Sequence, residues 1–220
     1  MNPAPPPPRR IAILGAGGHA YVVAEALEIA GLELAGHIAP APAATAGFGP
    51  YLGLYLGGDS ALPDLLPRFD LALGLGFVDA AGALRRAALL VLLNQLGARL
   101  ICVVHPQAMV SASARLEAGA FIAMGAIVGT RAKIGGGAIV NSGAVIDHDS
   151  QLAENCHLAT GARLAGGVTV GRDVLIGAGA VVRQGLSIGA GAIIGAGAVV
   201  IRPVAVGSTV FGNPARAKAL

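Results

Sequence analysis

An aliphatic side chain returns at every sixth position through the second half of this chain, and the register never slips. The series runs through Val110, Leu116, Ile122, Val128, Ile134, Val140, Ile146, Leu152, Leu158, Leu164, Val170, Ile176, Val182, Ile188, Ile194, Val200 and Val206. Four positions after most of these residues comes a smaller apolar residue, from Ala114 to Ala180, with Ser150 and Cys156 in the same series. Such a strict repeat is the signature of a parallel β-helix, in which each hexad supplies one short strand and one turn.

Three hexads make one triangular coil of eighteen residues, and successive coils stack about 4.8 Å apart, which is the normal spacing between strands. Residues that are eighteen positions apart then share one edge of the prism. One such column consists of glycines only: Gly125, Gly143, Gly161, Gly179 and Gly197. Glycine adopts a positive φ without the steric cost of a Cβ atom, so we expect this column to form a corner where the chain turns.

The residues before the repeat alternate between short apolar runs and helical spacing. Strands are predicted at 11–14, 32–38, 69–73 and 99–104, helices at 21–30 and 80–96, and a loop at 39–57. This alternation indicates a small parallel sheet with helices on its faces. The predicted fold class is therefore a small α/β, Rossmann-like domain at 10–104, followed by a parallel β-helix at 105–220 that ends in a short C-terminal tail. Residues 1–9 are Pro-rich, and we expect a disordered tail there.

Hydrophobic residues make up 55% of the chain, and residues 184–201 form an uncharged run of about the length of a membrane span. Glycine interrupts this run every two or three residues, and the six-residue period continues through it, so we assign it to the β-helix. The N-terminal sequence MNPAPPPP lacks the apolar segment of a signal peptide. We expect a cytoplasmic protein that does not insert into a membrane.

Charge and cysteine content narrow the possible partners. The net charge of +3 is small and dispersed, and basic residues do not interleave with aromatic ones, which argues against a nucleic-acid-binding surface. Cys102 and Cys156 have neither metal-binding nor redox spacing. We expect two buried, reduced thiols and no metal site.

Polar residues interrupt the hexads around His148. This histidine lies two places after the inward-facing Ile146, so it belongs to a corner and points outward. Eighteen residues further on, Gly166 has no side chain, which leaves room for a ligand beside the imidazole. A neutral histidine can take a proton from an attacking amine or hydroxyl group, with Asp149 or Asp147 setting its tautomer. A histidine base, a neighbouring carboxylate and an open corner for a ligand suit acyl transfer.

Two further features fit the same chemistry. The Gly166 amide can bind a thioester oxygen as negative charge develops on it. His157, the second histidine of the repeat, has two interpretations at this stage, which are ligand contact and packing at a corner.

The N-terminal loop GAGGHA, at residues 15–20, follows a strand and opens a helix. Backbone amides at such a helix N-terminus can hold a phosphate group, and His19 can reach that phosphate or the attached sugar, or cap the helix. The loop also resembles a dinucleotide fingerprint, which expects an acidic residue at the end of the second strand. Residues 36–40 contain none, so a nucleoside diphosphate is expected here rather than a redox cofactor.

These residues carry a resemblance to the hexapeptide acyltransferases of the sialic acid O-acetyltransferase type. Within that group, the chain is similar to the branch that N-acetylates nucleotide-linked 4-amino-4,6-dideoxy sugars, including the UDP-N-acetylbacillosamine pathway enzyme. The resemblance covers nearly the whole chain after residue 9. It rests on GAGGHA, HPQAMVSASA at the junction, NSGAVIDHDSQLAENCHLATGARLAGGVTVG in the repeat, and GNPA near the end.

The resemblance implies a left-handed β-helix and a homotrimer with active sites between adjacent prisms, acting in glycan biosynthesis. It implies acetyl-CoA as co-substrate, with no metal, and a nucleotide sugar held by the N-terminal domain. By matching motif positions, it assigns the general base to His148 with Asp149 as its acidic neighbour, contacts with acetyl-CoA to His157 and Gly166, and the nucleotide-sugar loop to Gly15, Gly17, Gly18 and His19. Relatives commonly carry acidic residues where this chain has residues 37–40, which leaves UDP, GDP and dTDP open as the nucleotide.

Three alternatives belong beside this expectation. The first is O-acetylation of a sialic acid or a similar sugar by the same residues. The second is a zinc hydro-lyase, which needs three converging histidines, whereas the repeat supplies only His148 and His157. The third is a non-catalytic prism that binds a sugar nucleotide.

Overall fold

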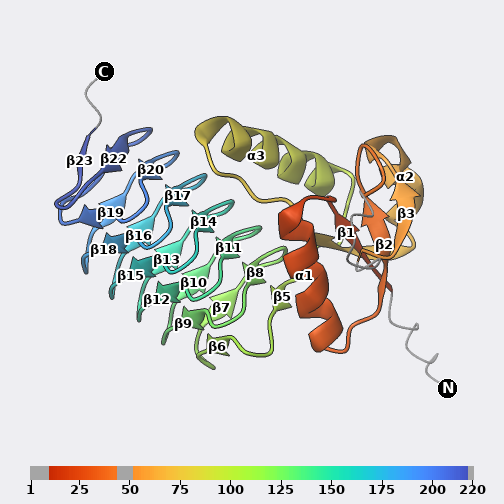
Figure 1. Cartoon of the computed structure of the whole chain (residues 1–220), viewed down its shortest axis with the longest axis horizontal. Helices are drawn as coiled ribbons and strands as arrows, with labels where there is room; N and C mark the ends of the chain where they lie inside the picture. The colour runs from red at the N-terminus through yellow and green to blue at the C-terminus, as the bar shows by residue number, and fades with distance from the viewer. Residues whose placement is uncertain (1–9, 44–51, 218–220) are drawn as a thin grey trace.

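The computed structural model describes residues 10–43 and 52–217, and within them the chain forms an α/β domain joined to a long prism (Figure 1). The predicted N-terminal tail at 1–9 and part of the predicted loop at 39–57 lie outside the described residues. The α/β domain contains strands β1 (Arg10–Leu14), β2 (Leu34–Ile38), β3 (Leu54–Gly57) and β4 (Phe69–Leu73), helices α1 (Gly18–Ile29), α2 (Leu62–Leu65) and α3 (Ala80–Gln95), and a 3₁₀ turn at Asp59–Ala61.

The four strands of the α/β domain form one parallel sheet in the order β3-β2-β1-β4. Helix α1 packs its apolar face, which includes Val23 and Leu27, against this sheet. Strand β3 lies inside the segment predicted as a loop, so that prediction was wrong at this end. The strand is short, half exposed and at the sheet edge, and its sequence therefore lacks the continuous apolar run of a buried parallel strand.

The prism confirms the predicted three-faced parallel β-helix, with two-residue strands at most hexads. Its β14 sheet consists of β5 (Val103–Val104), β8 (Phe121–Ile122), β11 (Ile139–Val140), β14 (His157–Leu158), β17 (Leu175–Ile176), β20 (Ile193–Ile194), β22 (Thr209–Phe211) and β23 (Arg216–Ala217). Its β12 sheet consists of β6 (Met109–Val110), β9 (Ile127–Val128), β12 (Val145–Ile146), β15 (Arg163–Leu164), β18 (Val181–Val182) and β21 (Val199–Val200). Its β13 sheet consists of β7 (Arg115–Leu116), β10 (Lys133–Ile134), β13 (Gln151–Leu152), β16 (Thr169–Val170) and β19 (Ser187–Ile188).

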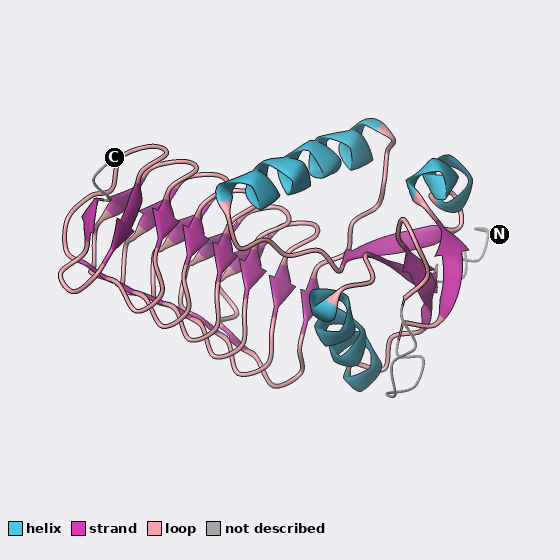
Figure 2. Ribbon diagram, turned by 45° about the horizontal axis from the view of Figure 1, so that its top comes forward, coloured by secondary structure: helices cyan, strands magenta, loops and turns pink. Residues whose placement is uncertain are grey.

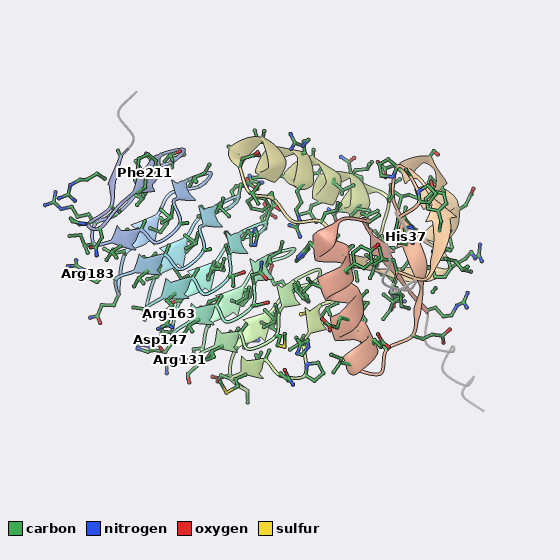
Figure 3. The ribbon with its side chains drawn as sticks, in the orientation of Figure 1. His37, Arg131, Asp147, Arg163, Arg183 and Phe211 are labelled. Carbon is green, nitrogen blue, oxygen red and sulfur yellow. The ribbon has the colours of Figure 1, made fainter. Side chains whose placement is uncertain are left out.

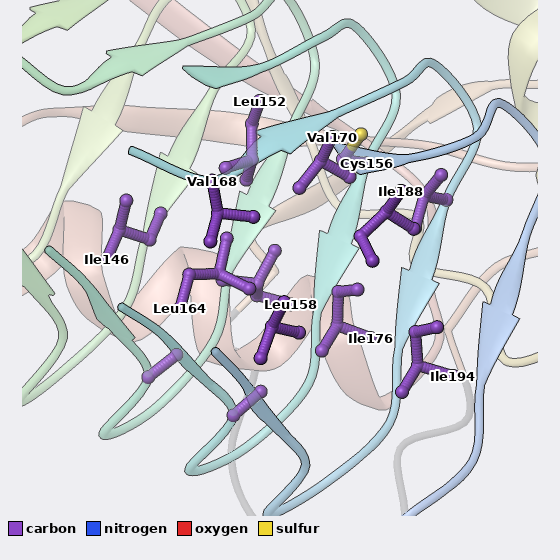
Figure 4. Packing of buried hydrophobic residues seen from close by; sticks show 14 of the residues in the cluster. Ile146, Leu152, Cys156, Leu158, Leu164, Val168, Val170, Ile176, Ile188 and Ile194 are labelled. Atoms are coloured by element: carbon purple, nitrogen blue, oxygen red, sulfur yellow. The ribbon is translucent and has the colours of Figure 1, made fainter. Parts of the chain in front are cut away.

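From β5 to β21 the strands pair with a register of eighteen residues, as in the pairing of Ile146 with Val128 on one side and Leu164 on the other. The last coil is two residues shorter, because Ile194 pairs with Val210. The predicted glycine column is confirmed as a corner, because the five glycines from Gly125 to Gly197 all have φ between 65° and 68°. The sixth-position residues up to Val200 fill the interior, where Ile146, Leu158 and Leu164 are at most 1% exposed (Figure 4). The predicted inward position of Val206 was wrong, because Val206 is 75% exposed and Val204 pairs with Ile188 in its place. The uncharged run at 184–201 belongs to these coils. Over the described residues, no helix combines the length and the apolarity needed to cross a bilayer.

The segment predicted as one strand at 99–104 is divided between the two parts of the molecule. Leu100 forms an isolated bridge with Leu71 of the α/β sheet, whereas Val103–Val104 pairs with β8 in the first coil of the prism. An apolar run shows that a strand is buried but does not show which sheet it joins. The prism therefore begins just before His105, and the chain passes directly from one sheet into the next.

The outer faces of the three sheets differ in what covers them and in which side chains they present. The β14 sheet is covered by the α/β domain, and α3 runs along the prism beside it (Figure 2). The β13 sheet presents polar side chains such as Lys133 and Gln151. The β12 sheet presents an outward row that is apolar except for the exposed Arg163, with Met109 61% exposed and Val181 38% exposed.

Candidate active site

His148 lies at the corner between the β12 and β13 sheets, in the turn that follows Ile146. Its ring contacts Asp149, with 2.9 Å between Nδ1 and Oδ2, and its backbone N–H donates to Oδ1 of Asp147 at 2.7 Å. Of the two carboxylates considered from the sequence, Asp149 is thus the one that orients the imidazole. Since an ionised carboxylate only accepts hydrogen bonds, Nδ1 carries the proton, and the neutral ring has its lone pair on Nε2.

Gly166 lies one coil further along the same corner, as the eighteen-residue coil predicts. A Cβ atom built on Gly166 would lie 2.5 Å from Nε2 of His148, inside van der Waals contact. The neighbouring Gly167 N–H donates to the carbonyl oxygen of His148 at 2.8 Å, which holds the two turns together. The basic nitrogen of the imidazole therefore faces a corner that is bare of side-chain atoms.

Asp149 also binds a residue that the sequence analysis did not single out. Arg131 donates from Nε to Oδ1 at 2.6 Å and from Nη2 to Oδ2 at 2.7 Å, in a two-point ion pair. These bonds, followed by the bond from His148, hold the pKa of the Asp149 carboxyl well below its usual range. Arg131 precedes Asp149 by eighteen residues, so the coil period itself was the signal that would have found it. Figure 3 shows Arg131 and Asp147 on one edge of the prism.

His157 lies in a different place, on the β14 sheet against the α/β domain, and is 7% exposed. Its Nδ1 donates to the carbonyl oxygen of Phe77 at 2.7 Å, and Nε2 lies 3.3 Å from the side-chain amide nitrogen of Asn141. Burial lowers the pKa of His157, although the bond to Phe77 opposes this effect. Within one chain, His157 is thus separated from the corner of His148, and its contact with acetyl-CoA stays a prediction.

A cleft of about 660 Å³ separates the α/β domain from the prism beside His157. Its lining comes from the N-terminal loop, from the loop after β4, from α3 and from the edge between the β14 and β12 sheets: Gly17, Gly18, His19, Val22, Gly74, Leu75, Gly76, Phe77, Val78, Asp79, Gly82, Arg85, Asn141, Ser142, His157 and Thr160. Two parts of the chain that are distant in sequence therefore share one open site.

The N-terminal loop presents backbone rather than side chains to this cleft. Gly17 caps α1 without any side-chain hydrogen bond, and a Cβ atom on Gly17 or Gly18 would meet no atom within 4 Å. The unpaired amides at the start of a helix favour an anion. Gly15 has another role, because its φ is +122° and a Cβ atom there would lie 2.8 Å from the carbonyl oxygen of Gly74. It lets the loop after β1 pass close to the loop after β4.

His19 lies in the wall of the cleft, and Nε2 of its ring is buried without a hydrogen-bond partner among the described residues. Its ring packs edge-on against Phe121, with 5.3 Å between centroids. Burial, followed by the nearby His157 and Arg86, lowers the pKa of His19 to about 4. The imidazole is therefore neutral near pH 7.

A buried polar link, which the sequence analysis missed, joins the two parts of the molecule. Arg86 of α3 donates to the carbonyl oxygen of Leu75 at 2.7 Å and to Oδ1 of Asn155 at 2.5 Å. The Asn155 amide in turn donates to Oδ1 of Asp173 at 2.7 Å. Burial lowers the pKa of Arg86 to about 10. This link fixes α3 against the prism and so sets the position of the cleft wall.

His37 occupies the end of β2, where a dinucleotide-binding domain places its carboxylate. It is 4% exposed, donates from Nδ1 to the carbonyl oxygen of Leu52 at 3.2 Å and accepts at Nε2 from the N–H of Ala43 at 3.0 Å. Both ring nitrogens are used within the protein, and Figure 3 shows the residue in the α/β domain, far from Arg131. The side chain is structural at this position.

Comparison with known proteins finds solved structures that are similar over nearly the whole chain. The family model described as bacterial transferase hexapeptide (six repeats) matches residues 149–184 and 167–202. PerB from Caulobacter crescentus, solved in complex with CoA and GDP-perosamine, is 37% identical with a TM-score of 0.86, over 96% of this chain and 97% of that chain. The acetyltransferase domain of PglB from Neisseria gonorrhoeae, solved with acetyl coenzyme A, is 32% identical with a TM-score of 0.86, over 96% and 99% of the two chains. No curated protein sequence matches this chain.

Proposed function

Because this chain belongs to the hexapeptide-repeat acetyltransferases, we propose that it transfers the acetyl group of acetyl-CoA to the 4-amino group of a nucleotide-linked 4-amino-4,6-dideoxy sugar. The observation that carries the proposal is the corner of His148, where an oriented imidazole turns its basic nitrogen toward Gly166. PerB, solved with CoA and GDP-perosamine, and the PglB domain, solved with acetyl coenzyme A, support the choice of substrates.

The proposed reaction is a direct transfer. The amine nitrogen attacks the thioester carbonyl carbon, and Nε2 of His148 takes the proton that the amine loses. The carbon–sulfur bond then breaks, and the thiol of CoA leaves with a proton returned by the imidazole. Asp149 supports the imidazolium ion that exists between these two proton transfers, and the Gly166 amide is the candidate donor to the thioester oxygen as charge develops there. This direct transfer requires no covalent enzyme intermediate.

The cleft is the proposed site of the nucleotide sugar. The uncapped start of α1 at Gly17 and Gly18 would bind a phosphate of the nucleotide, and the neutral His19 would contact that phosphate through its free nitrogen or contact the sugar. His37 uses both ring nitrogens inside the protein. The base and ribose are therefore recognised by other groups, and the choice among UDP, GDP and dTDP stays open.

A homotrimer would complete the site. His148 lies on one edge of the β12 sheet, and Asn141, Ser142 and Thr160 of the cleft lie on the opposite edge of the same sheet. The exposed apolar row between these edges is a natural contact surface for further copies of the chain. In a closed ring of three copies packed through this sheet, the His148 edge of one copy lies beside the cleft edge of the next.

The decisive experiment is an acceptor panel with acetyl-CoA, in which release of the CoA thiol is measured. The panel contains UDP-, GDP- and dTDP-linked 4-amino sugars, their 4-hydroxy counterparts and a free sialic acid. We expect thiol release with at least one amino sugar and N-acetylation of its product. Activity confined to hydroxyl acceptors would replace the proposal by O-acetylation. Nucleotide-sugar binding without thiol release from any acceptor would favour a non-catalytic prism.

A further inference from the structure

Four non-glycine residues in the described part of the chain have a positive φ, and they form two stacked pairs. Arg131 (φ 57°) lies one coil below Asp149 (φ 60°), and Asn155 (φ 56°) lies one coil below Asp173 (φ 61°). A left-handed conformation disfavours any residue with a Cβ atom, and glycine is the usual occupant. Gly167, one coil above Asp149, shows that glycine serves at this corner. Asn and Asp adopt this conformation more readily than other residues with a Cβ atom, so Arg131 is the unusual occupant of the four.

The pair formed by Asn155 and Asp173 is explained by the link to Arg86, which holds α3 against the prism. The pair formed by Arg131 and Asp149 has no such packing role, because their side chains are 67% and 41% exposed. Exposed ion pairs contribute little to stability. What distinguishes this pair is its third member, since Oδ2 of Asp149 accepts from both Arg131 and His148.

We propose that Arg131 is a positioning residue for the acetyl transfer, which acts on the general base His148 through Asp149. The inference rests on the proposed function. With both carboxylate oxygens held by one planar guanidinium group, the Asp149 carboxylate cannot rotate, and its hydrogen bond to Nδ1 directs Nε2 toward Gly166. The Arg131 charge also offsets the carboxylate charge beside the imidazole.

The charged groups bonded to His148 or to its partner Asp149 are Asp147 and Asp149 in its own turn and Arg131 in the coil below. Arg163 lies on the same edge of the prism (Figure 3). Removing Arg131 leaves the Asp149 carboxylate beside the imidazole without the cation that binds both of its oxygens. The protonated imidazole then becomes more favourable, and the enzyme needs a higher pH to hold its base in the active form.

The test compares Arg131→Gly and Arg131→Lys with the parent enzyme. Glycine removes the side chain and suits the positive φ, so folding is preserved. For Arg131→Gly, we expect kcat to fall by about 10- to 100-fold with little change in KM. We also expect the acidic limb of the kcat/KM profile to move by roughly 0.5 to 1 pH unit toward higher pH. Arg131→Lys keeps the charge but not the two-point contact, so it should restore the acidic limb and only part of kcat.

A second readout does not depend on turnover. Nitrogen-15 NMR of the labelled protein should show His148 as the Nδ1–H tautomer in the parent enzyme and as a mixture in Arg131→Gly. The matched control is Glu154→Ala, which breaks another exposed pair of stacked residues, Arg172 with Glu154 at 2.8 Å, on a different corner, and leaves Arg172 beside Asp173. We expect this control to keep the parent pH profile and kcat.

Each outcome decides between distinct conclusions. An Arg131→Gly enzyme with the parent acidic limb and the parent tautomer would overturn the inference, whether kcat changes or not, because a merely structural role predicts no change in either. The absence of thiol release by the parent enzyme with every nucleotide-linked 4-amino sugar would instead reject the proposed function. The two failures are therefore separable within one set of proteins.

Discussion

The imidazole of His148 occupies the space that a side chain at Gly166 would need, one coil further along the prism: a Cβ atom there would lie 2.5 Å from Nε2. Other positions of this corner column carry side chains, such as Thr130 below His148 and Gln184 above Gly166. The backbone of the corner thus tolerates a side chain, and the imidazole is the reason for glycine at this position.

Replacing Gly166 with alanine tests this relationship. The added methyl group should push the His148 ring away from its position, with a loss of about 10-fold or more in kcat, because small displacements of a reacting group are costly. The fold and the melting temperature should change little. The matched control is Gly136→Ala, at a turn where a Cβ atom would lie 3.4 Å from its nearest neighbour and where stacked positions carry Glu154 and Arg172. Equal activity of both variants would contradict the steric account.

Replacing His148 with alanine removes the proposed base. We expect turnover with an accepted amino sugar to fall by a factor of about 10² or more, the usual contribution of a general base. His148 is exposed at its corner, with 59% of its side chain accessible, so the fold should survive, and gel filtration and circular dichroism would verify this. Near-normal turnover in a correctly folded variant would reject the assignment.

Mixed trimers test whether the active site is shared between copies. His148→Ala removes the base, and Gly18→Glu places a negative charge at the proposed phosphate site in the cleft. Each homotrimer should be inactive. Co-expression should restore about a quarter of the parent activity, because three-quarters of random trimers are mixed and each of these keeps one intact site in three. If both halves of the site belonged to one chain, no activity would return.

His19 makes stability depend on pH in a defined direction. Its pKa is about 4 in the folded protein, compared with 6.5 for the unperturbed group. The unfolded chain therefore binds the proton first as the pH falls. Stability should decrease between pH 6.5 and pH 4, by up to about 3 kcal/mol from this group.

The measurement is the free energy of unfolding in urea at several pH values between 7 and 4, for the parent protein and for His19→Asn. The variant should lose less stability on acidification, although His157, whose pKa is also lowered by burial, contributes in the same direction. An identical loss in both proteins would show that His19 is not protected from protonation in the fold.

The hexad register by itself determined the prism up to Val200 and the juxtaposition of His148 with Gly166. In a β-helix, each residue contacts the residues eighteen places before and after it, so position in the sequence converts directly into position in space. The same rule identifies Arg131 as a neighbour of Asp149, because it lies eighteen residues earlier in the sequence. For this half of the chain, sequence spacing and spatial contact carry the same information.

The tertiary structure alone decided how the α/β domain sits on the prism. No period connects Arg86 with Asn155, or His157 with Phe77, because these contacts join surfaces that pack by shape and by hydrogen bonds between segments far apart in sequence. For the same reason, the sequence did not show that Val103–Val104 joins the first coil or that β3 completes the edge of the α/β sheet. The cleft exists only because that packing leaves Gly17 and Gly18 uncovered beside the β14 sheet.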